Sequence, residues 1–195
     1  MKQNWKPGTM IYPLPAILVS CGNTPEEYNI FTASWTGTIC SDPAMCYVSI
    51  RPERHSYEII KRTMEFVINL TTEELAYATD WSGVRSGRKF NKFKEMNLTA
   101  GPSTNISAPI VMESPISIEC KVKQIIPLGT HDMFIAEVVN VQADDKYLDP
   151  ATGKFDLSQA KPLVYSHGEY FGIGNKIGKF GWSVEKKNNK KIINK

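Results

Sequence analysis

The feature that most constrains the fold is a strict alternation of apolar and polar residues over positions 116–126. Apolar side chains occupy every second position and polar ones the positions between: Ile116, Ile118, Cys120 and Val122 alternate with Ser117, Glu119, Lys121 and Lys123. A period of two over this length is typical of a half-buried strand in an antiparallel sheet or barrel. The apolar segment 132–141 predicts a second strand, and the short connection through Pro127–Gly129 predicts an antiparallel hairpin.

Other segments of the chain agree with this pattern. Four short stretches rich in β-branched or aromatic residues predict strands over 16–20, 31–40, 45–50 and 65–70. Helical spacing is confined to short stretches at 56–61, 72–78 and 87–96, which we interpret as connectors between strands. The sequence therefore predicts a mainly β domain with short α connectors, folded as an antiparallel barrel. Barrels of this kind bind ligands at the mouth or at the interface with a partner chain.

Composition and charge narrow the class of protein. A chain of 195 residues with 42% hydrophobic residues is long and apolar enough for one domain with a core. Five of the 23 basic residues lie in the last ten positions, which leaves 18 basic against 20 acidic residues over 1–185. We therefore predict one domain over 1–185, a frayed Lys/Asn-rich tail at 186–195, and no nucleic-acid partner. No apolar run of membrane-spanning length or signal peptide is present, which favours a cytoplasmic protein without membrane contact.

The cysteines and histidines argue against a metal site. None of Cys21, Cys40, Cys46 and Cys120 forms a CxxC pair, and the three histidines are isolated from them in the sequence. This spacing does not fit zinc ligands. We expect the four thiols to be reduced and buried.

The glycine-rich stretch 168–181 does not fit a dinucleotide-binding motif. The GxGxxG pattern requires a glycine three positions after Gly174, where the chain has Ile177. GxxxxGK[ST] and GxSxG are also missing, which argues against phosphate-loop NTPases and α/β-hydrolases. We expect these glycines to mark bends and close packing in a terminal strand pair that includes the aromatic residues Tyr170, Phe171, Phe180 and Trp182.

Three segments carry side chains suited to binding an anionic, planar ligand. Segment 29–36 places hydroxyls at Thr32, Ser34 and Thr36 on one face of a predicted strand; a solvated sheet face is the alternative. Segments 49–56 and 86–92 each place basic and small polar residues before a predicted helix, where a phosphate would meet guanidinium groups and the helix dipole. For segment 49–56 the alternative is a capped helix with exposed arginines.

At these residues the sequence resembles a known family. The stretches are NIFTASWTG, SDPAMCYVSIRPERHSYEII, EFVINL, SGRKFNKF, IECKVKQIIPLGTHDMFIAEVV and YSHGEYFGIGNKIGKFGWSV. Together they resemble the flavoredoxin branch of the flavin reductase-like family, in register from about residue 10 to 185. The resemblance implies an FMN-binding antiparallel split barrel as a single domain over 1–185. It also implies a homodimer with the flavin near the subunit interface.

The resemblance also implies which residues bind the cofactor. The isoalloxazine ring would lie against Asn29, Thr32, Ala33, Ser34 and Trp35, bordered by Ser49 and Ile50. The phosphate would be held by Arg51, Arg54 and Ser56, with help from Ser86, Gly87, Arg88 and Lys92. Tyr165 and His167 would approach the flavin from the C-terminal strand, and His131 is the other candidate for a catalytic side chain.

The resemblance is compatible with three hypotheses about function. The first is an enzyme, an FMN-dependent oxidoreductase that moves electrons from NAD(P)H to a flavin or other acceptor. The family's NAD(P)H-using reductases typically carry Gly-Asp-His, where this chain has Gly129-Thr130-His131-Asp132, so the second reading is a flavoredoxin-type carrier that exchanges electrons with protein partners. The third is a split barrel that binds another cofactor or only dimerises.

Overall fold

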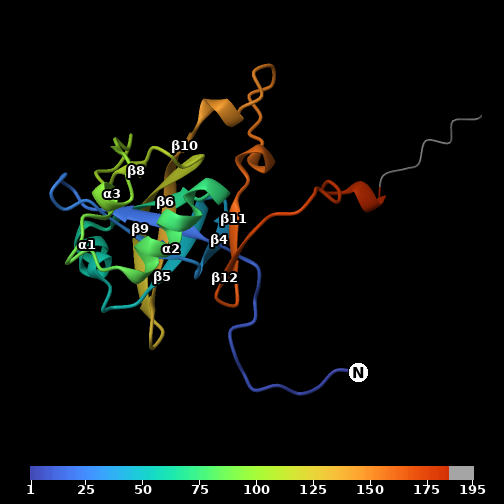
Figure 1. Cartoon of the computed structure of the whole chain (residues 1–195), viewed down its shortest axis with the longest axis horizontal. Helices are drawn as coiled ribbons and strands as arrows, with labels where there is room; N and C mark the ends of the chain where they lie inside the picture. The colour runs from blue at the N-terminus through green and yellow to red at the C-terminus, as the bar shows by residue number, and fades with distance from the viewer. Residues whose placement is uncertain (185–195) are drawn as a thin grey trace, which may run out of the picture.

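A computed structural model describes residues 1–184, and the predicted tail at 186–195 lies outside the described residues (Figure 1). Helices are few and short, and the strands form most of the body. The strands are β1 Leu14–Pro15, β2 Ile17–Cys21, β3 Asn29–Ala33, β4 Thr36–Ser41, β5 Ala44–Ile50, β6 Glu65–Leu70, β7 Ala100–Gly101, β8 Ile110–Val111, β9 Ile116–Pro127, β10 Asp132–Ala143, β11 Leu163–Ser166 and β12 Glu169–Gly172. The α-helices are α1 His55–Thr63, α2 Ala76–Val84 and α3 Lys92–Glu95, and the 3-10 turns are η1 Glu73–Leu75, η2 Asp145–Tyr147, η3 Leu157–Ala160 and η4 Trp182–Val184.

The predicted mainly β, antiparallel architecture is confirmed. Within residues 1–184 the strands form one seven-stranded sheet in the order β3-β2-β6-β9-β10-β5-β4, a three-stranded sheet β1-β11-β12, and the pair β7-β8, all antiparallel. The largest cluster of buried apolar side chains draws on β2, β3, β5, β6, β9, β10 and α1. The core is therefore enclosed by the large sheet, with α1 packed against it.

The predicted β9–β10 hairpin is present. The alternation of apolar and polar residues in β9, however, does not match a buried face and an exposed face along the whole strand. Lys121 and Lys123 are exposed, whereas Ser117 and Glu119 are buried. The Glu119 carboxylate accepts hydrogen bonds from two backbone amides of the 102–108 segment and from side chains of β10: Thr104 N at 2.8 Å, Asn105 N at 2.7 Å, Asn140 Nδ2 at 2.8 Å and Gln142 Nε2 at 2.9 Å. The prediction of a half-buried strand is therefore wrong for the first half of β9, where a loop covers the polar face.

The predicted strand over 31–40 is also wrong, because the chain breaks at Ser34 and Trp35. β3 and β4 lie at opposite ends of the strand order, so the two residues between them link the two edges of the large sheet. The Ser49 amide of β5 donates to the Trp35 carbonyl at 2.8 Å across this link. We call this place, where the β3 edge meets β5, the seam. Thr32 Oγ1 donates to the Thr79 carbonyl and Thr36 Oγ1 to the Tyr47 carbonyl, so the three predicted hydroxyls do not share one strand face.

The predicted helices shift in extent. The first runs over α1 His55–Thr63, two residues longer than expected at its C-terminal end, and the second continues from η1 into α2 as far as Val84. The third contracts from 87–96 to the four residues of α3, which the Asn91 side chain caps by accepting from Lys94 N at 3.1 Å. Residues 85–91 are therefore a loop between two helices.

Cysteine placement agrees with the prediction in part. All four thiols are free, and three are buried, but Cys40 is half-exposed near the end of β4. Cys46 and Cys120 face each other inside the barrel with their sulfur atoms 3.5 Å apart. The prediction that all four are buried is wrong for Cys40, because β4 is an edge strand.

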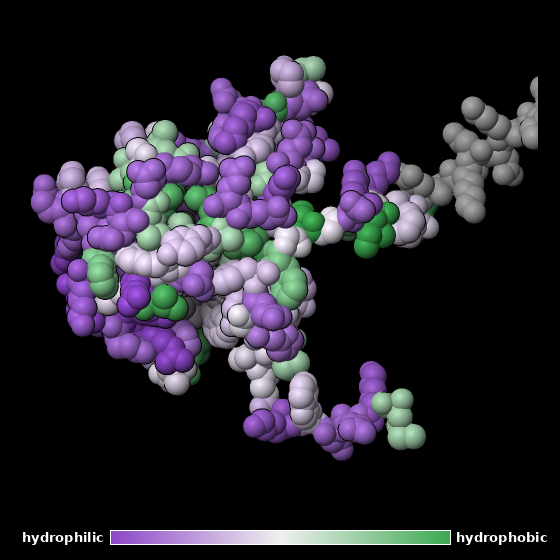
Figure 2. Space-filling view, viewed as in Figure 1, coloured by the Kyte–Doolittle hydropathy of each residue, from purple (hydrophilic) through white to green (hydrophobic). Residues whose placement is uncertain are grey.

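The C-terminal part forms the predicted strand pair and then leaves the body. β11 pairs with β12 in the register Tyr165↔Tyr170, and the chain turns through His167 and Gly168, both at positive φ. Figures 1 and 2 show the chain after β12 running out from the body as an arm. Phe180 is fully exposed, so close packing of that residue against a terminal strand pair was a wrong prediction. No helix in residues 1–184 is long and apolar enough to span a membrane.

Candidate functional site

Two adjoining pockets lie where β3, the seam, the end of β5 and the start of α1 meet. The first, which we call the basic pocket, has a volume of about 400 Å³ and is lined by Asn29, Phe31, Arg51, Glu53, Arg54, His55, Ser56, Val84, Arg85, Ser86, Gly87 and Lys92. The second, the aromatic pocket, has a volume of about 380 Å³ and is lined by Phe31, Thr32, Ala33, Ser34, Trp35, Ser49, Ile50, Arg51, Arg54, Asp80, Gly83, Val84, His131, Tyr165 and Tyr170. Phe31, Arg51, Arg54 and Val84 line both, so the pockets adjoin one another.

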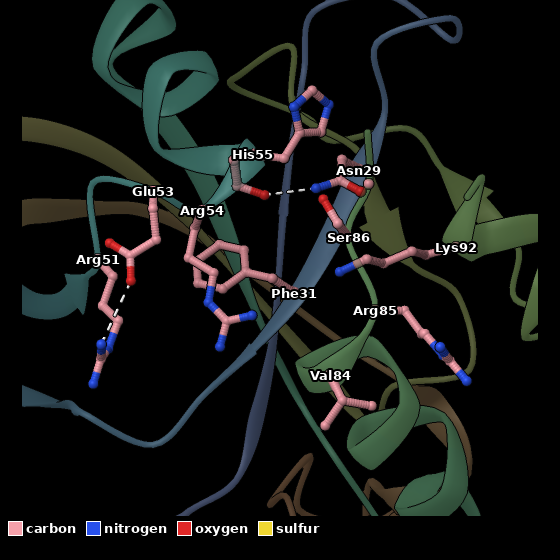
Figure 3. A pocket seen from close by; sticks show the side chains of 12 residues that line it. Asn29, Phe31, Arg51, Glu53, Arg54, His55, Val84, Arg85, Ser86 and Lys92 are labelled. Atoms are coloured by element: carbon pink, nitrogen blue, oxygen red, sulfur yellow. Dashed lines mark hydrogen bonds and ion pairs between the residues drawn. The ribbon is translucent and has the colours of Figure 1, made fainter. Parts of the chain in front are cut away.

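The basic pocket carries a large excess of positive charge. Its four basic side chains are Arg51, Arg54, Arg85 and Lys92, against the single carboxylate of Glu53 among the lining residues. Arg51 Nη1 lies 3.5 Å from Glu53 Oε1 in a solvent-exposed pair, which contributes little to stability (Figure 3). The remaining cations make the pocket suitable for an anion.

The N-terminal end of α1 opens on the basic pocket. Arg54 is the residue before the helix, and its side chain does not cap it. Instead, Arg54 Nη1 donates to the Gly83 carbonyl of α2 at 2.7 Å, which holds the guanidinium between the two pockets. The backbone N–H groups at the start of a helix favour an anion, and here they lie beside the pocket's cations.

Close packing shapes the floor of the basic pocket. Asn29 Nδ2 donates to Ser56 Oγ at 2.7 Å, which ties β3 to α1. Gly87 approaches this pair so closely that a Cβ there would meet the Asn29 side chain and lie 2.7 Å from His55 Cδ2. Position 87 therefore requires glycine to keep the 85–91 loop against the pocket.

Lys92 and His55 of the basic pocket both have lowered pKa values. Burial, followed by the charge of Arg54, lowers the pKa of Lys92 to about 8. Burial and the charges of Arg88 and Lys92 lower the pKa of His55 below its usual value. Burial and the neighbouring cations therefore favour the neutral forms of Lys92 and His55.

Aromatic side chains dominate the second pocket. The Trp35 ring lies 6.3 Å from that of Tyr165 and 6.4 Å from that of His131, to which it is nearly parallel. Tyr165 meets Tyr170 edge-on at 5.9 Å across the β11–β12 pair. Burial and the neighbouring Asp80 carboxylate raise the pKa of Tyr170 to about 12, so its hydroxyl stays protonated near neutral pH. These rings suit a flat, largely apolar ligand.

The structure brings most of the predicted cofactor residues together. Asn29, Ser56, Ser86, Gly87 and Lys92 line the basic pocket; Thr32, Ala33, Ser34, Trp35, Ser49, Ile50 and Tyr165 line the aromatic pocket; Arg51 and Arg54 line both. Arg88 lies outside the lining of both pockets, and its guanidinium donates to the Glu53 carbonyl at 3.1 Å.

The two histidines singled out in the sequence lie in different environments. His131 lines the aromatic pocket. His167 lines neither pocket: it occupies the β11–β12 turn, with its ring 4.2 Å from that of Tyr12. His167 is therefore a turn residue that packs against the N-terminal segment.

Several lining residues were not predicted. Tyr170 has a recognisable signal, because a turn at His167-Gly168 places it directly opposite Tyr165. Arg85 directly precedes the predicted 86–92 segment. Asp80 and Phe31 carry no local signal and enter the site only through the packing of α2 and β3.

The two pockets together match the chemistry of a flavin phosphate. An anionic group fits the cations and the α1 terminus of the basic pocket, and a planar ring system fits the aromatic pocket. Each volume lies within the range of small-molecule sites, about 300–1,000 Å³. The residues present therefore fit such a ligand at both of its ends.

Comparisons with known proteins agree with this geometry. A model of the flavin reductase like domain matches residues 9–174. A flavoredoxin of Desulfovibrio vulgaris (Miyazaki F) superposes with a TM-score of 0.87 at 29% identity, covering 95% of this chain and all of that one.

Two curated relatives extend the comparison. An uncharacterized protein of Archaeoglobus fulgidus is 30% identical over 161 residues, 83% of this chain and 88% of the relative. An NADH:FMN oxidoreductase of Rhodococcus qingshengii is 27% identical over 142 residues, 72% of this chain and 66% of the relative. The family is a flavin-binding one, and the fold is the split barrel that the resemblance implies. With a family model that spans most of its length, this chain belongs to the flavin reductase-like family, in the flavoredoxin branch that its motifs predicted.

Proposed function

We propose that the chain binds FMN across the two pockets and moves electrons from NAD(P)H through it to a flavin or another acceptor. The observation that carries the proposal is the adjoining arrangement of a cationic and an aromatic pocket, with Arg54 lining both. The similarity to an NADH:FMN oxidoreductase supports the choice of FMN and of a nicotinamide donor.

In this proposal the basic pocket provides affinity. Arg54 and Lys92 neutralise the phosphate, while the Asn29–Ser56 hydrogen bond holds the start of α1 in place beneath it. The Gly83 carbonyl fixes the Arg54 guanidinium before the ligand arrives, which lowers the entropy cost of binding.

The aromatic pocket provides position and excludes water. Trp35 and Tyr165 present ring faces and edges to the flat part of the cofactor, and the seam backbone at Ser34–Trp35 borders it. FMN, when bound, supplies the redox chemistry, accepting electrons from a hydride donor and passing them on. Because the cofactor supplies that chemistry, none of the lining side chains has to act as an acid or base.

A specific observation favours a second candidate, an electron carrier that does not use NAD(P)H. Asp132 stands after His131 rather than before it, and Tyr57 Oη donates to its carboxylate at 2.5 Å. That carboxylate is therefore engaged with α1. Together with the similarity to a flavoredoxin, this supports a carrier whose FMN exchanges electrons with a protein partner.

We also propose that two copies of the chain form a homodimer. The arm after β12 exposes apolar side chains that the body of the same chain does not cover, among them Ile177, Phe180 and Val184. Exposed apolar groups of this kind are stabilised by burial against a partner. Light scattering during size exclusion measures the mass directly, and a monomer at micromolar concentration contradicts this part of the proposal.

The experiment that tests the function is an absorption spectrum of the purified protein followed by FMN titration, monitored by flavin fluorescence. Flavin bands, or micromolar or tighter uptake of added FMN, are expected. A colourless protein that ignores FMN refutes the proposal. Steady NAD(P)H oxidation in the presence of excess FMN then supports the enzyme, whereas a bound flavin that only a protein donor reduces supports the carrier.

A further inference from the structure

Lys92 differs from the other basic residues of the chain in its burial. Only 3% of its surface is exposed, and it is the one basic side chain within residues 1–184 that is buried. Its Nζ donates to the Ser82 carbonyl at 2.6 Å. Figure 3 shows the Lys92 side chain extending into the basic pocket, with its ammonium below Ser86 in this view.

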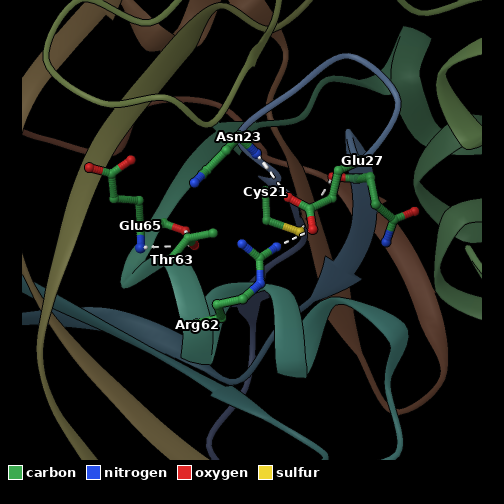
Figure 4. A network of polar contacts seen from close by, with 7 residues as sticks. Cys21, Asn23, Glu27, Arg62, Thr63 and Glu65 are labelled. Atoms are coloured by element: carbon green, nitrogen blue, oxygen red, sulfur yellow. Dashed lines mark hydrogen bonds and ion pairs between the residues drawn. The ribbon is translucent and has the colours of Figure 1, made fainter.

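Among residues 1–184, no carboxylate forms an ion pair with Lys92. From the α1 side it meets Arg54 and His55, and from β2 the Cys21 thiol. Glu53 pairs with Arg51, and Glu27 pairs with Arg62 of α1 (Figure 4). A buried ammonium without an opposite charge is costly, which is why its pKa falls to about 8.

The neighbouring groups do not titrate in the same range. Burial raises the pKa of the Cys21 thiol to about 12, so it stays protonated, and the pKa of His55 is lowered, so this ring is neutral above pH 7. The arginines keep their charge throughout. Between pH 7 and 9, Lys92 is therefore the titrating group of the basic pocket.

We propose that Lys92 couples ligand binding to proton uptake: a phosphate monoester dianion enters the basic pocket together with a proton, which Lys92 Nζ takes from solvent and holds. The proposal rests on the site assigned under the proposed function and adds the proton to its ligand. Above about pH 8 the amine of the empty pocket is mostly neutral, which avoids burying an unpaired charge. The dianion supplies the missing opposite charge, and the ammonium becomes the stable form.

The proposal has a quantitative consequence. With a pKa of about 8 in the free protein, the fraction of protonated Lys92 falls about tenfold between pH 7 and 9, and ligand affinity falls by the same factor. A phosphate monoester does not contribute to this change, because its second pKa is about 6.

Isothermal titration calorimetry tests the proposal. FMN is titrated into the protein at pH 8.5 in two phosphate-free buffers that differ in ionisation enthalpy, and the difference in heat gives the protons taken up. We expect uptake of about 0.8 proton per FMN in the parent protein, from the neutral fraction at that pH. Riboflavin, which lacks the phosphate, should bind without uptake.

Three variants separate Lys92 from its neighbours. Lys92→Arg keeps a permanent charge, so it should bind FMN with no uptake and with an affinity that is flat from pH 7 to 9. Lys92→Met should bind weakly and equally flatly. Lys94→Met, at the exposed lysine of the same short helix, is the matched control and should retain the parent's uptake. Circular dichroism verifies that each variant is folded.

The outcomes also distinguish this proposal from the function itself. FMN binding with no proton uptake in the parent protein, or unchanged uptake in Lys92→Arg, overturns the role of Lys92 and leaves the FMN site standing. If FMN does not bind at all, the proposed function fails, and inorganic phosphate is titrated under the same conditions. Uptake with phosphate then upholds the role of Lys92, and no uptake overturns it.

Discussion

The basic pocket and the aromatic pocket share Phe31, Arg51, Arg54 and Val84, but most of their lining comes from different parts of the chain. The basic pocket is formed by the start of α1, the 85–91 loop and α3, which bring four cations within one cavity. The aromatic pocket is formed by β3, the seam, β5 and the β11–β12 pair, which bring rings together. The lining of the first pocket suits a ligand group bound through charge, and the lining of the second suits one bound through shape.

The difference indicates how the two ends of a ligand are recognised. Charge in the basic pocket acts on a phosphate whatever is attached to it, and weakens with salt. Ring packing in the aromatic pocket acts on a flat ligand whether or not it carries a phosphate. Comparing FMN with riboflavin therefore separates the two pockets experimentally.

The largest expected effect comes from Arg54→Ala, which removes the guanidinium that lines both pockets. Loss of a charged hydrogen bond of about 2 kcal/mol predicts an FMN affinity about 30-fold weaker, while riboflavin should change much less. Fluorescence titration measures both. Arg62→Ala, which removes an arginine paired with Glu27 at the other end of α1, is the control. Equal losses for FMN and riboflavin would break the division between the pockets.

A smaller loss is expected from Tyr165→Ala in the aromatic pocket. Removing a ring contact worth about 1 kcal/mol, together with part of its buried area, predicts an affinity about tenfold weaker for FMN and riboflavin alike. Tyr147→Ala, which removes a tyrosine outside both pockets, is the matched control. A variant that lost FMN but kept riboflavin would place Tyr165 on the phosphate side.

Gly87→Ala examines the packing of the basic pocket. Its Cβ would meet the Asn29 side chain and His55, which forces the loop outward and predicts an FMN affinity about fivefold weaker, from about 1 kcal/mol of overpacking. The control is Gly174→Ala, at a glycine with open space around it. An unchanged FMN affinity in Gly87→Ala would show that the loop tolerates displacement without loss of the site.

Glu119→Gln should leave both affinities within about twofold, because Glu119 lies outside both pockets. It should lower stability at pH 7 by about 1–3 kcal/mol, since the donors from Asn140 and Gln142 lose a charged acceptor. Burial alone would raise the Glu119 pKa, but the hydrogen bonds outweigh it and lower the pKa below 4.5. The stability this provides is present above about pH 4.5 and lost on acidification.

Urea unfolding of the parent and Glu119→Gln, at pH 7 and at pH 3, measures this difference. The two proteins should differ at pH 7, and the difference should be smaller at pH 3. A difference that grew on acidification would mean that the native carboxyl group binds its proton more tightly than the unfolded one.

Sequence patterns predicted the antiparallel architecture, the β9–β10 hairpin and the cluster of polar residues that lines the two pockets. They failed where tertiary contacts override a local pattern. The Ser34–Trp35 break lies inside a continuous stretch of good strand residues, and only the need to link two sheet edges explains it. Glu119 fits an exposed position by period, yet a distant segment supplies two amide donors to it.

The seam links ligand binding to the local stability of the barrel. At Trp35 the barrel is joined by a backbone hydrogen bond to Ser49, and the aromatic pocket lies along this line, with the basic pocket adjoining it at Arg51 and Arg54. A ligand bound there contacts β3, β5 and α1 at the same time. It therefore helps to hold the barrel closed. Amide hydrogen exchange along the Trp35–Ser49 line should therefore slow in proportion to ligand affinity, because opening the seam requires the ligand to leave. In such a protein the bound cofactor stabilises the barrel that binds it.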